Sequence, residues 1–342
     1  MTTAEKWRAL ARILAITVPI GGVIGAVLGW LIGRSVSSAA AGAVIGVLVT
    51  AGIVGFNVAW EAGLISRRWR EAPFLVVLLT RSLVWLAVIV VGVSVPLLTI
   101  GGLSTADLVD QGFVISITAS FGAALLVNFV SQVDRLLGRG VLLHLVLGRY
   151  HRPREETRVF LLVDLRGSTQ IAERLGNLRF HAYLRRFIGD VTAAVARHRG
   201  EVYRYVGDEV IVTWTAADGL RDARCVRAVF AVDDALAAAS DEYEAEFGMA
   251  PGFWAGLHVG PVVAGEVGTF KHEITYLGDT LNVAARIEGA CKELGKQVLA
   301  SADVVSAIRL PGDVAAENLG GVELRGVAEP IEVFALTRAP KR

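Results

Sequence analysis

Two aspartates in the second half of the chain stand where β-structure is predicted to end or turn. Asp164 follows the run Val159–Val163, which predicts a buried strand because it is short and continuously apolar. Asp208 is the second residue of a Gly-Asp pair within VYRYVGDEVIVTW, and such a pair between two β-rich runs predicts a hairpin turn. If the two strands are neighbours, both carboxylates lie at one end of the same sheet.

Two carboxylates held close together repel each other unless cations lie between them. Hard carboxylate oxygens suit Mg²⁺, which also bridges to phosphate oxygens. The segment Arg166–Thr169 turns at a glycine and leads into a predicted helix, whose first amides suit triphosphate oxygens. Together these features predict a two-metal site for attack on phosphorus. An ordinary hairpin with glycine and aspartate at its turn is the plainer interpretation and stays open here, and Glu209 receives no role.

The elements that must hold these acids alternate between strand and helix patterns. A helix is predicted around 180–200, then the hairpin 202–214, then a helix around 221–248. FWAGLHVGPVVAGEVG predicts two strands around a Gly-Pro turn, followed by a helix from Asp279, a further strand and a closing hairpin over 322–336. This order resembles an elaborated ferredoxin-like α+β unit with its helices on one face of the sheet.

The first half of the chain has a different composition. Residues 1–150 carry eleven Lys and Arg and six Asp and Glu, whereas the remainder carries twenty-three and twenty-seven. Four apolar segments of the first half come near the ~20 residues that cross a bilayer. They cover residues 10–32, 39–65, 74–100 and 113–133. The first is too long for a cleaved signal peptide. We therefore expect an all-α, four-helix transmembrane domain.

Basic residues predict which ends of these spans face the cytoplasm. Lys6 and Arg8 precede the first span, arginines at 67–70 follow the second, and Arg135 and Arg139 follow the fourth. The loop STADLVDQG between the third and fourth spans carries two acids and no base. The positive-inside rule therefore predicts a multi-pass protein of the cell (inner or plasma) membrane, with both termini in the cytoplasm.

Small and polar residues within the spans indicate how the helices could pack. Glycines four apart line one face of the first span and begin another on the second: Gly21, Gly25, Gly29, Gly33, Gly42 and Gly46. They allow close helix packing, either within one chain or between two chains. The polar residues in or near the spans could sense a signal or simply pair near the cytoplasmic face. They are Asn57, Glu61, Arg81 and Asn128.

The segment 134–156 joins the two halves. Apolar residues between Leu136 and Val146 suit a short helix that pairs with its copy in a partner chain, and a plain linker is the alternative. We therefore expect three parts: a transmembrane domain over 1–133, this coupling segment, and a cytoplasmic domain over 157–342.

Composition argues against other classes of protein. No concentrated basic patch with interleaved aromatic residues is present, so nucleic-acid binding is not expected. Cys225 and Cys291 are far apart and lack the spacing of metal ligands, which predicts reduced thiols in a cytoplasmic domain. His144 is the only histidine before residue 150, so a haem held by two histidines of one chain is not expected.

Several motifs, in order along residues 158–336, resemble the catalytic domain of the class III nucleotide cyclases. FLLVDLRGST matches the strand-end metal aspartate of that family with Asp164, and the Gly-Asp hairpin matches the second metal aspartate with Asp208. KHEITYLGDTLNVAARIE and ELRGV match the nucleotide-binding positions of the family. These fall on Lys271, Thr275, Asn282, Arg286 and Arg325.

The resemblance implies a role for each matched residue. The metal ligands are Asp164, Leu165 through its backbone carbonyl, and Asp208, which hold two Mg²⁺ (or Mn²⁺) ions per active site. Of the catalytic pair, Asn282 holds the ribose and Arg286 meets the charge at the α-phosphate. The substrate-binding residues are Lys271 and Thr275 at the base, Arg325 at the terminal phosphates, and Arg166, Gly167, Ser168 and Thr169 in the phosphate loop.

The resemblance also implies a reaction and a partner. The 3′-hydroxyl of ATP attacks its own α-phosphorus, which yields 3′,5′-cyclic AMP and expels pyrophosphate. The two aspartates come from one chain and the nucleotide-binding residues from its partner, so a homodimer in the lipid bilayer carries two complete sites and a lone chain is inactive.

The substrate and the reaction each have an alternative. Lys271 and Thr275 favour ATP over GTP, although Thr275 stands where other members have aspartate, and a guanylate cyclase remains the alternative. A membrane receptor whose cyclase-like domain binds nucleotide without turnover is a second alternative. A diguanylate cyclase is disfavoured, because VGDEV lacks the first glycine and the phenylalanine of a GGDEF turn.

Overall fold

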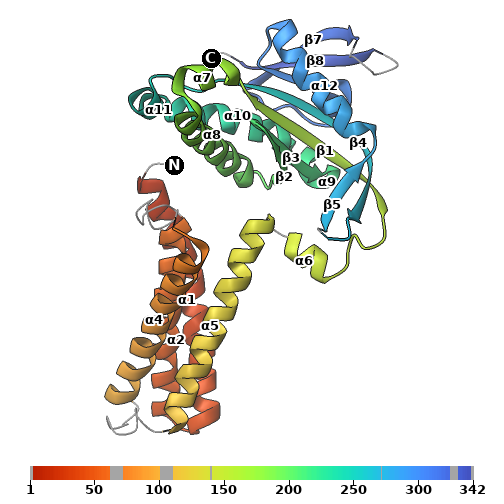
Figure 1. Ribbon diagram of the computed structural model, residues 1–342. Coiled ribbons are helices and arrows are strands. Elements are labelled where there is room, and N and C mark those ends of the chain that lie inside the picture. Colours follow the sequence, from red (N-terminus) through yellow and green to blue (C-terminus); the bar gives the residue numbers. More distant parts are fainter. Residues whose placement is uncertain are drawn as a thin grey trace. The chain divides into compact units, whose positions relative to one another are not determined.

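The computed structural model describes residues 3–61, 72–100, 111–138, 141–270, 272–323 and 330–339. The chain forms two compact units, Met1–Leu136 and Leu137–Arg342, and Figure 1 shows one as a set of long helices and the other as a sheet with helices.

The first unit contains four long helices: α1 (Thr3–Gly33), α2 (Val36–Glu61), α4 (Phe74–Thr99) and α5 (Gln111–Leu137). Each contains a stretch long and apolar enough to cross a membrane: Ala11–Gly33, Val36–Trp60, Phe74–Thr99 and Phe113–Leu136. The four predicted spans are thus confirmed as four apolar helices, and positions 62–65 of the second prediction lie outside the described residues.

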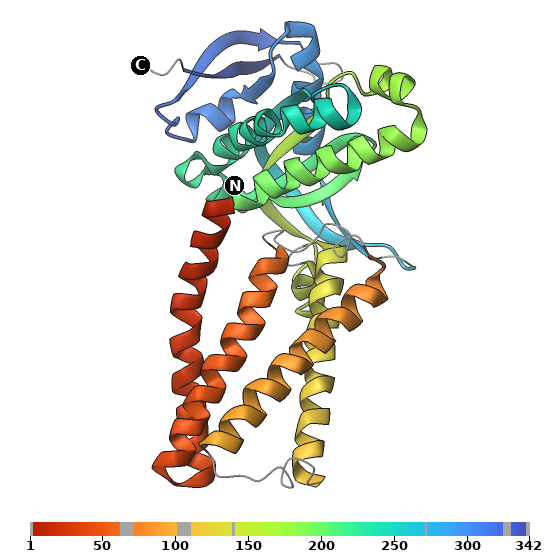
Figure 2. The same cartoon turned by 90° about the vertical axis from the view of Figure 1, so that its left-hand side faces the viewer.

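The glycine faces of α1 and α2 pack against each other. A Cβ atom built on Gly25 would lie 2.1 Å from the carbonyl oxygen of Gly42, and one on Gly46 would lie 2.0 Å from the carbonyl oxygen of Gly21. Such distances leave no room for a side chain, so the two backbones approach as closely as small-residue faces allow. In Figure 2 the red α1 and the red-orange α2 run side by side from the turn that joins them. Packing within one chain therefore accounts for these glycines.

Polar side chains pair between the helices of this unit. Arg81 is buried, donates from Nη2 to Oδ1 of Asn57 at 2.9 Å, and lies 5.7 Å from the ring centroid of Trp60. Asn128 is also buried and donates from Nδ2 to Oγ of Ser82 at 3.4 Å. Each contact gives one buried polar atom a partner in an apolar environment, where an unpaired polar group is costly.

The second unit is built on an eight-stranded mixed sheet in the order β2-β3-β1-β4-β6-β8-β7, with β5 paired to β4. The strands are β1 (Arg154–Leu165), β2 (Glu201–Val206), β3 (Glu209–Thr215), β4 (Phe253–Val267), β5 (Glu273–Leu277), β6 (Val298–Ser301), β7 (Val314–Val322) and β8 (Ile331–Arg338). The central strand β1 pairs antiparallel with both β3 and β4.

Helices cover both faces of this sheet. They are α7 (Ser168–Leu175), α8 (Asn177–Arg197), α9 (Ala216–Leu220), α10 (Arg224–Ala238), α11 (Ser240–Phe247), α12 (Asp279–Leu294) and α13 (Ala302–Ser306), and the short helix α6 (Val141–Val146) precedes β1. Leu161 of β1 belongs to a core cluster with Phe187 of α8 and Val229 of α10. Phe160, the preceding residue, packs in a separate cluster with Ala284 of α12.

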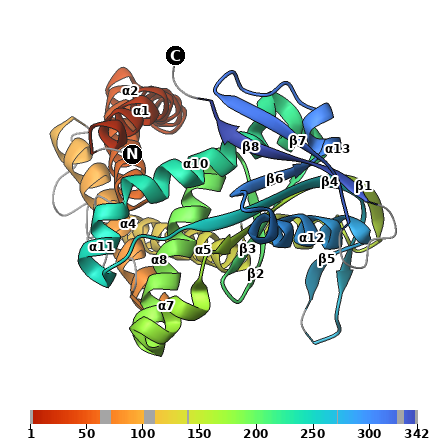
Figure 3. The same cartoon turned by 90° about the horizontal axis from the view of Figure 1, so that it is seen from above.

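The fold class predicted from the sequence is confirmed, but the expectation that all helices lie on one face is wrong. Figure 3 shows α10 and α12 on either side of β4 and β6. The physical reason was already visible in Val159–Val163, because a strand that is apolar at every position is buried on both faces.

The predicted Gly-Pro turn is also wrong, because Gly260 and Pro261 lie inside the single long strand β4. Pairing of β4 with β6 ends at Leu257 and pairing with β5 begins at Val263, so β4 has only β1 as a neighbour between them. A proline, which lacks an N–H group, is tolerated in a strand that has one open side.

Candidate active site

Strand pairing brings Asp164 beside the β2–β3 hairpin. Val163 pairs with Val210 of β3, and Asp164 pairs with Trp254 of β4. The β2–β3 pairing closes at Val206 and Glu209, which leaves Gly207 and Asp208 as a two-residue turn. Gly207 has a φ of 63°, a left-handed conformation that tight hairpin turns require and that glycine adopts without strain. The neighbour relation predicted from the sequence is therefore present.

The electrostatics show that the two aspartates are adjacent. Burial, the charge of Asp208 and a hydrogen bond with that residue together raise the pKa of Asp164 from 3.8 to about 6. A backbone hydrogen bond from Leu165 acts in the opposite direction and is outweighed. Two carboxyl groups this close favour sharing a proton or binding a cation over carrying two uncompensated charges.

Two glutamates extend this pair into a cluster of four acids. The pKa of Glu209 is raised to about 7, first by burial and then by the charges of Asp164 and Asp208. The pKa of Glu288 on α12 is raised to about 7 by burial and by the other three acids. We call these four residues the acid cluster. Among the described residues no three His, Cys, Asp or Glu side chains are grouped as an ion site, so a bound cation would need further oxygens beside those of the two aspartates.

The sequence did not predict a role for either glutamate. In the sequence, the place of Glu209 directly after the metal-site candidate Asp208 could have indicated its role. Nothing in the sequence indicated a role for Glu288, because its position depends on the contact of α12 with β4. A Cβ atom on Gly256 would lie 2.5 Å from the backbone nitrogen of Glu288, so this glycine allows α12 to approach the sheet closely.

The predicted phosphate loop lies between β1 and α7. The backbone N–H of Arg166 donates to the carbonyl oxygen of Gly252 at 3.0 Å, and its guanidinium carbon lies 3.7 Å from the ring centroid of Trp254. Gly167, with a φ of 70°, precedes α7. Ser168 and Thr169 therefore occupy the first turn of that helix, where backbone N–H groups lack partners within the helix.

The remaining candidates lie on β5 and α12 or outside the described residues. Thr275 is half-buried on β5, opposite Gly265 of β4. Asn282 and Arg286 are exposed on α12, and Asn282 donates from Nδ2 to Oδ1 of Asp279 at 3.4 Å. Lys271 and Arg325 lie outside the described residues.

On helix α12, Glu288 lies on a different side from the predicted catalytic pair, Asn282 and Arg286. Glu288 is half-buried, and burial together with the charges of the other three acids raises its pKa. Arg286 is exposed and stands two residues earlier, which is about 200° around an α-helix. The chain thus brings together the two aspartates and the phosphate loop, and it presents Asn282 and Arg286 on the solvent-exposed side of α12.

The solved structures of similar shape define the class of this fold. A bacterial light-regulated adenylyl cyclase superposes with a TM-score of 0.55 at 20% sequence identity, over 67% of this chain and 67% of that chain. A second structure described in the same terms gives a TM-score of 0.52 at 22% identity, over 62% of each chain. At this level of identity the similarity shows the fold alone.

The sequence then identifies the family. Residues 151–338 match the model of the adenylate and guanylate cyclase catalytic domain, which is more than half of the chain, and the protein belongs to that family. It is 44% identical over 209 residues to adenylate cyclase 2 of Rhizobium meliloti (strain 1021), across 61% of this chain and 58% of that protein. It is 28% identical over 180 residues to the adenylate cyclase of Anabaena cylindrica, across 51% of this chain and 35% of that protein. The chain therefore spans little more than half of the first relative and about a third of the second.

Proposed function

We propose that the protein is a membrane-bound adenylate cyclase that converts ATP to 3′,5′-cyclic AMP and pyrophosphate for intracellular signalling. The observation that carries the proposal is the contact of Asp164 with Asp208, at the end of β1 and at the tip of the β2–β3 hairpin. Family membership and the names of both relatives support the same reaction.

The acid cluster fits divalent cations. Besides burial, the charges of neighbouring acids raise the pKa of Asp164 and of Glu209, and binding of a cation relieves that repulsion. Asp164, Asp208 and the backbone carbonyl of Leu165 would hold two Mg²⁺ or Mn²⁺ ions, whose hard-oxygen preference these ligands match. When bound, such ions supply a lower pKa for a ribose hydroxyl and a counter-charge for the triphosphate.

The other candidate residues bind and orient the nucleotide. Lys271 and Thr275 contact the base, Asn282 holds the ribose, and Arg286 donates to the α-phosphate oxygens, where negative charge develops. Arg325 binds the β- and γ-phosphates and thereby orients the pyrophosphate leaving group. The first amides of α7, with Gly167, Ser168 and Thr169, bind phosphate oxygens in the same way, and Arg166 adds a positive charge beside them.

We infer that each active site is shared between two chains of a homodimer. The orientation of α12 supports this inference, because Arg286 and Asn282 are exposed on the side away from the acid cluster. A second copy of the chain would place its Arg286 opposite the aspartates of the first. Two equivalent sites then form in one symmetric dimer.

The four apolar helices support a multi-pass location in the cell (inner or plasma) membrane, in contact with the lipid bilayer. Both termini lie in the cytoplasm according to the distribution of basic residues. We propose the same three parts as above: a transmembrane domain over 1–133, a coupling segment over 134–156 and a cyclase domain over 157–342.

The experiment supplies the purified full-length protein in detergent with ATP or GTP and with Mn²⁺ or Mg²⁺. We expect cyclic AMP as the main product, and Asp208→Ala should abolish it, whereas the exposed control Asp241→Ala should retain it. Cyclic GMP as the main product would replace the proposal by a guanylate cyclase. Nucleotide binding without any cyclic product would replace it by a nucleotide-binding receptor.

A further inference from the structure

A buried arginine lies at the centre of a polar network in the cyclase unit. Arg158 of β1 is 2% exposed, and its Nε donates to Oε1 of Glu156 at 2.7 Å. Its Nη1 donates to Oε2 of Glu201 on β2 at 3.3 Å. Burial alone would lower the pKa of Arg158, but Tyr276, Glu156 and Glu201 outweigh it and raise that pKa above its usual value. The guanidinium therefore stays charged, and a buried charge holds its partners in place because leaving it unpaired is costly.

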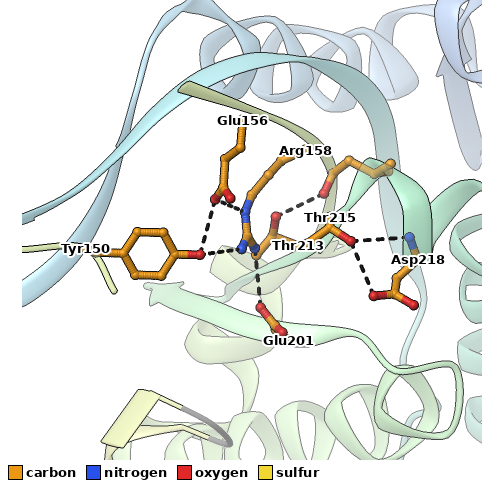
Figure 4. A network of polar contacts seen from close by, with 8 residues as sticks. Tyr150, Glu156, Arg158, Glu201, Thr213, Thr215 and Asp218 are labelled. Atoms are coloured by element: carbon orange, nitrogen blue, oxygen red, sulfur yellow. Dashed lines mark hydrogen bonds and ion pairs between the residues drawn. The ribbon is translucent and has the colours of Figure 1, made fainter. Parts of the chain in front are cut away.

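One partner of Arg158 comes from the segment between α6 and β1. Tyr150 is 3% exposed, and its hydroxyl accepts a hydrogen bond from Nη2 of Arg158 at 3.2 Å and donates one to Oε1 of Glu156 at 3.3 Å (Figure 4). The carbonyl oxygen of Tyr150 accepts a bond from the backbone N–H of Glu266 near the end of β4, at 2.9 Å. The segment that follows α6 is thus attached both to the buried charge and to β4.

The other side of Arg158 supports β5. Its guanidinium carbon lies 4.5 Å from the ring centroid of Tyr276, which is a favourable distance for a cation–π contact. Tyr276 is 9% exposed and also packs edge-on against Phe160, with the ring centroids 5.7 Å apart. Successive residues of a strand point to opposite faces, so a fixed Tyr276 also fixes the orientation of Thr275.

We propose that Tyr150, Arg158 and Tyr276 form a positioning network that sets the orientation of Thr275 from the segment preceding the cyclase domain. This rests on the proposed function only in that Thr275 contacts the nucleotide base. The three residues touch neither substrate nor metal, and they act through the placement of β5. A movement of the segment around Tyr150 would therefore change how tightly the base is held before it changed the chemical step.

The substitution Tyr150→Phe in the full-length protein removes both hydroxyl contacts and keeps the ring. We expect the KM for ATP to rise roughly three- to tenfold with kcat within about twofold, because a lost bond to a charged group loosens binding rather than the transition state. The matched control is Tyr243→Phe, which also removes a hydroxyl bond to a carboxylate, to Asp190 at 2.7 Å, from a fully buried ring. This control should leave the KM unchanged. An unchanged KM in Tyr150→Phe, or the same rise in both variants, would overturn the proposal.

The ring of Tyr276 provides a second pair of variants. Tyr276→Phe keeps a face for the cation of Arg158 and should retain the wild-type KM, whereas Tyr276→Leu removes that face and should raise the KM by a similar factor. Equal KM values for both variants would contradict a role for the cation–π contact.

Amide hydrogen exchange measured without nucleotide tests the positioning network independently of the proposed function. Exchange in Glu273–Leu277 should be faster in Tyr150→Phe than in the wild type, and unchanged in Tyr243→Phe. If the wild type makes no cyclic nucleotide, the proposed function fails, while faster exchange in this strand still supports the positioning network. Unchanged exchange in Tyr150→Phe would contradict the network whatever the enzymatic activity.

Discussion

Replacing Asp164 by asparagine removes one of two adjacent negative charges at the end of β1. In the metal-free protein the pKa of this carboxyl is raised from 3.8 to about 6, first by burial and then by Asp208. The folded state therefore binds protons more tightly than the unfolded state, and the Asp164 charge destabilises the fold at neutral pH. We expect Asp164→Asn to stabilise the metal-free protein while it removes a metal ligand.

The size of this effect follows from the shift in pKa. A rise of about two pKa units corresponds to about 3 kcal/mol at 1.36 kcal/mol per unit. Solvent screening of a half-buried group reduces this to about 1–2 kcal/mol. For a unit of this size, that gain raises the apparent melting temperature by about 2–8 °C.

The sign of the pH dependence is also determined. Between about pH 4 and pH 7 the folded wild type holds protons that the unfolded chain has released, so its unfolding free energy falls as the pH rises through that range. Asp164→Asn should flatten this dependence. Scanning calorimetry of the full-length protein in detergent with EDTA, from pH 5 to pH 8, measures both effects for the transition of the cyclase unit.

Addition of Mn²⁺ provides the complementary measurement. The ion should raise the melting temperature of the wild type, because it binds the folded state, and should leave Asp164→Asn nearly unchanged. The control is Asp313→Asn, a substitution of an exposed aspartate. Its melting temperatures with and without Mn²⁺ should match those of the wild type. A metal-free Asp164→Asn protein that is less stable than the wild type at pH 7.5 would refute the electrostatic reasoning.

Three further predictions follow from packing and burial. Gly25→Leu should destabilise the helical unit by about 1–3 kcal/mol in detergent denaturation, because its Cβ would lie 2.1 Å from a backbone oxygen of α2. The control Gly55→Leu should be tolerated, because a Cβ at that position meets nothing within 4 Å. Cys225 and Cys291 should resist a maleimide at pH 7.5 until the protein unfolds, since burial raises the pKa of each thiol to about 12. Arg166→Lys keeps the charge but loses the planar stacking on the tryptophan ring, and should raise the KM for ATP roughly two- to fivefold in the cyclase assay.

Local patterns predicted the position of the two aspartates well. A strand that ends just after Asp164 and a hairpin that turns at Asp208 can both be recognised from short segments, and only their pairing needed the tertiary structure. The four apolar helices could also be predicted from the sequence, because length and hydropathy suffice to recognise them.

Features that depend on contacts between distant segments were not predicted. Pro261 suggested a turn, and the long strand β4 accommodates it because one side of the strand is open there. Glu288 joins the acid cluster only because Gly256 lets α12 approach β4. Arg158 received no role from the sequence, because its burial depends on Glu201 and on Tyr150, which no local pattern connects to it.

The most direct test of the account mixes two inactive variants. Asp208→Ala lacks part of the acid pair, and Asn282→Ala lacks the ribose contact, so each homodimer should make no cyclic AMP from ATP. If each active site takes its aspartates from one chain and its asparagine from the other, a mixed dimer contains one intact site. Co-expressed chains, purified through a different tag on each, should then recover up to about half of the wild-type activity per dimer. No recovery in confirmed mixed dimers would contradict the shared active site.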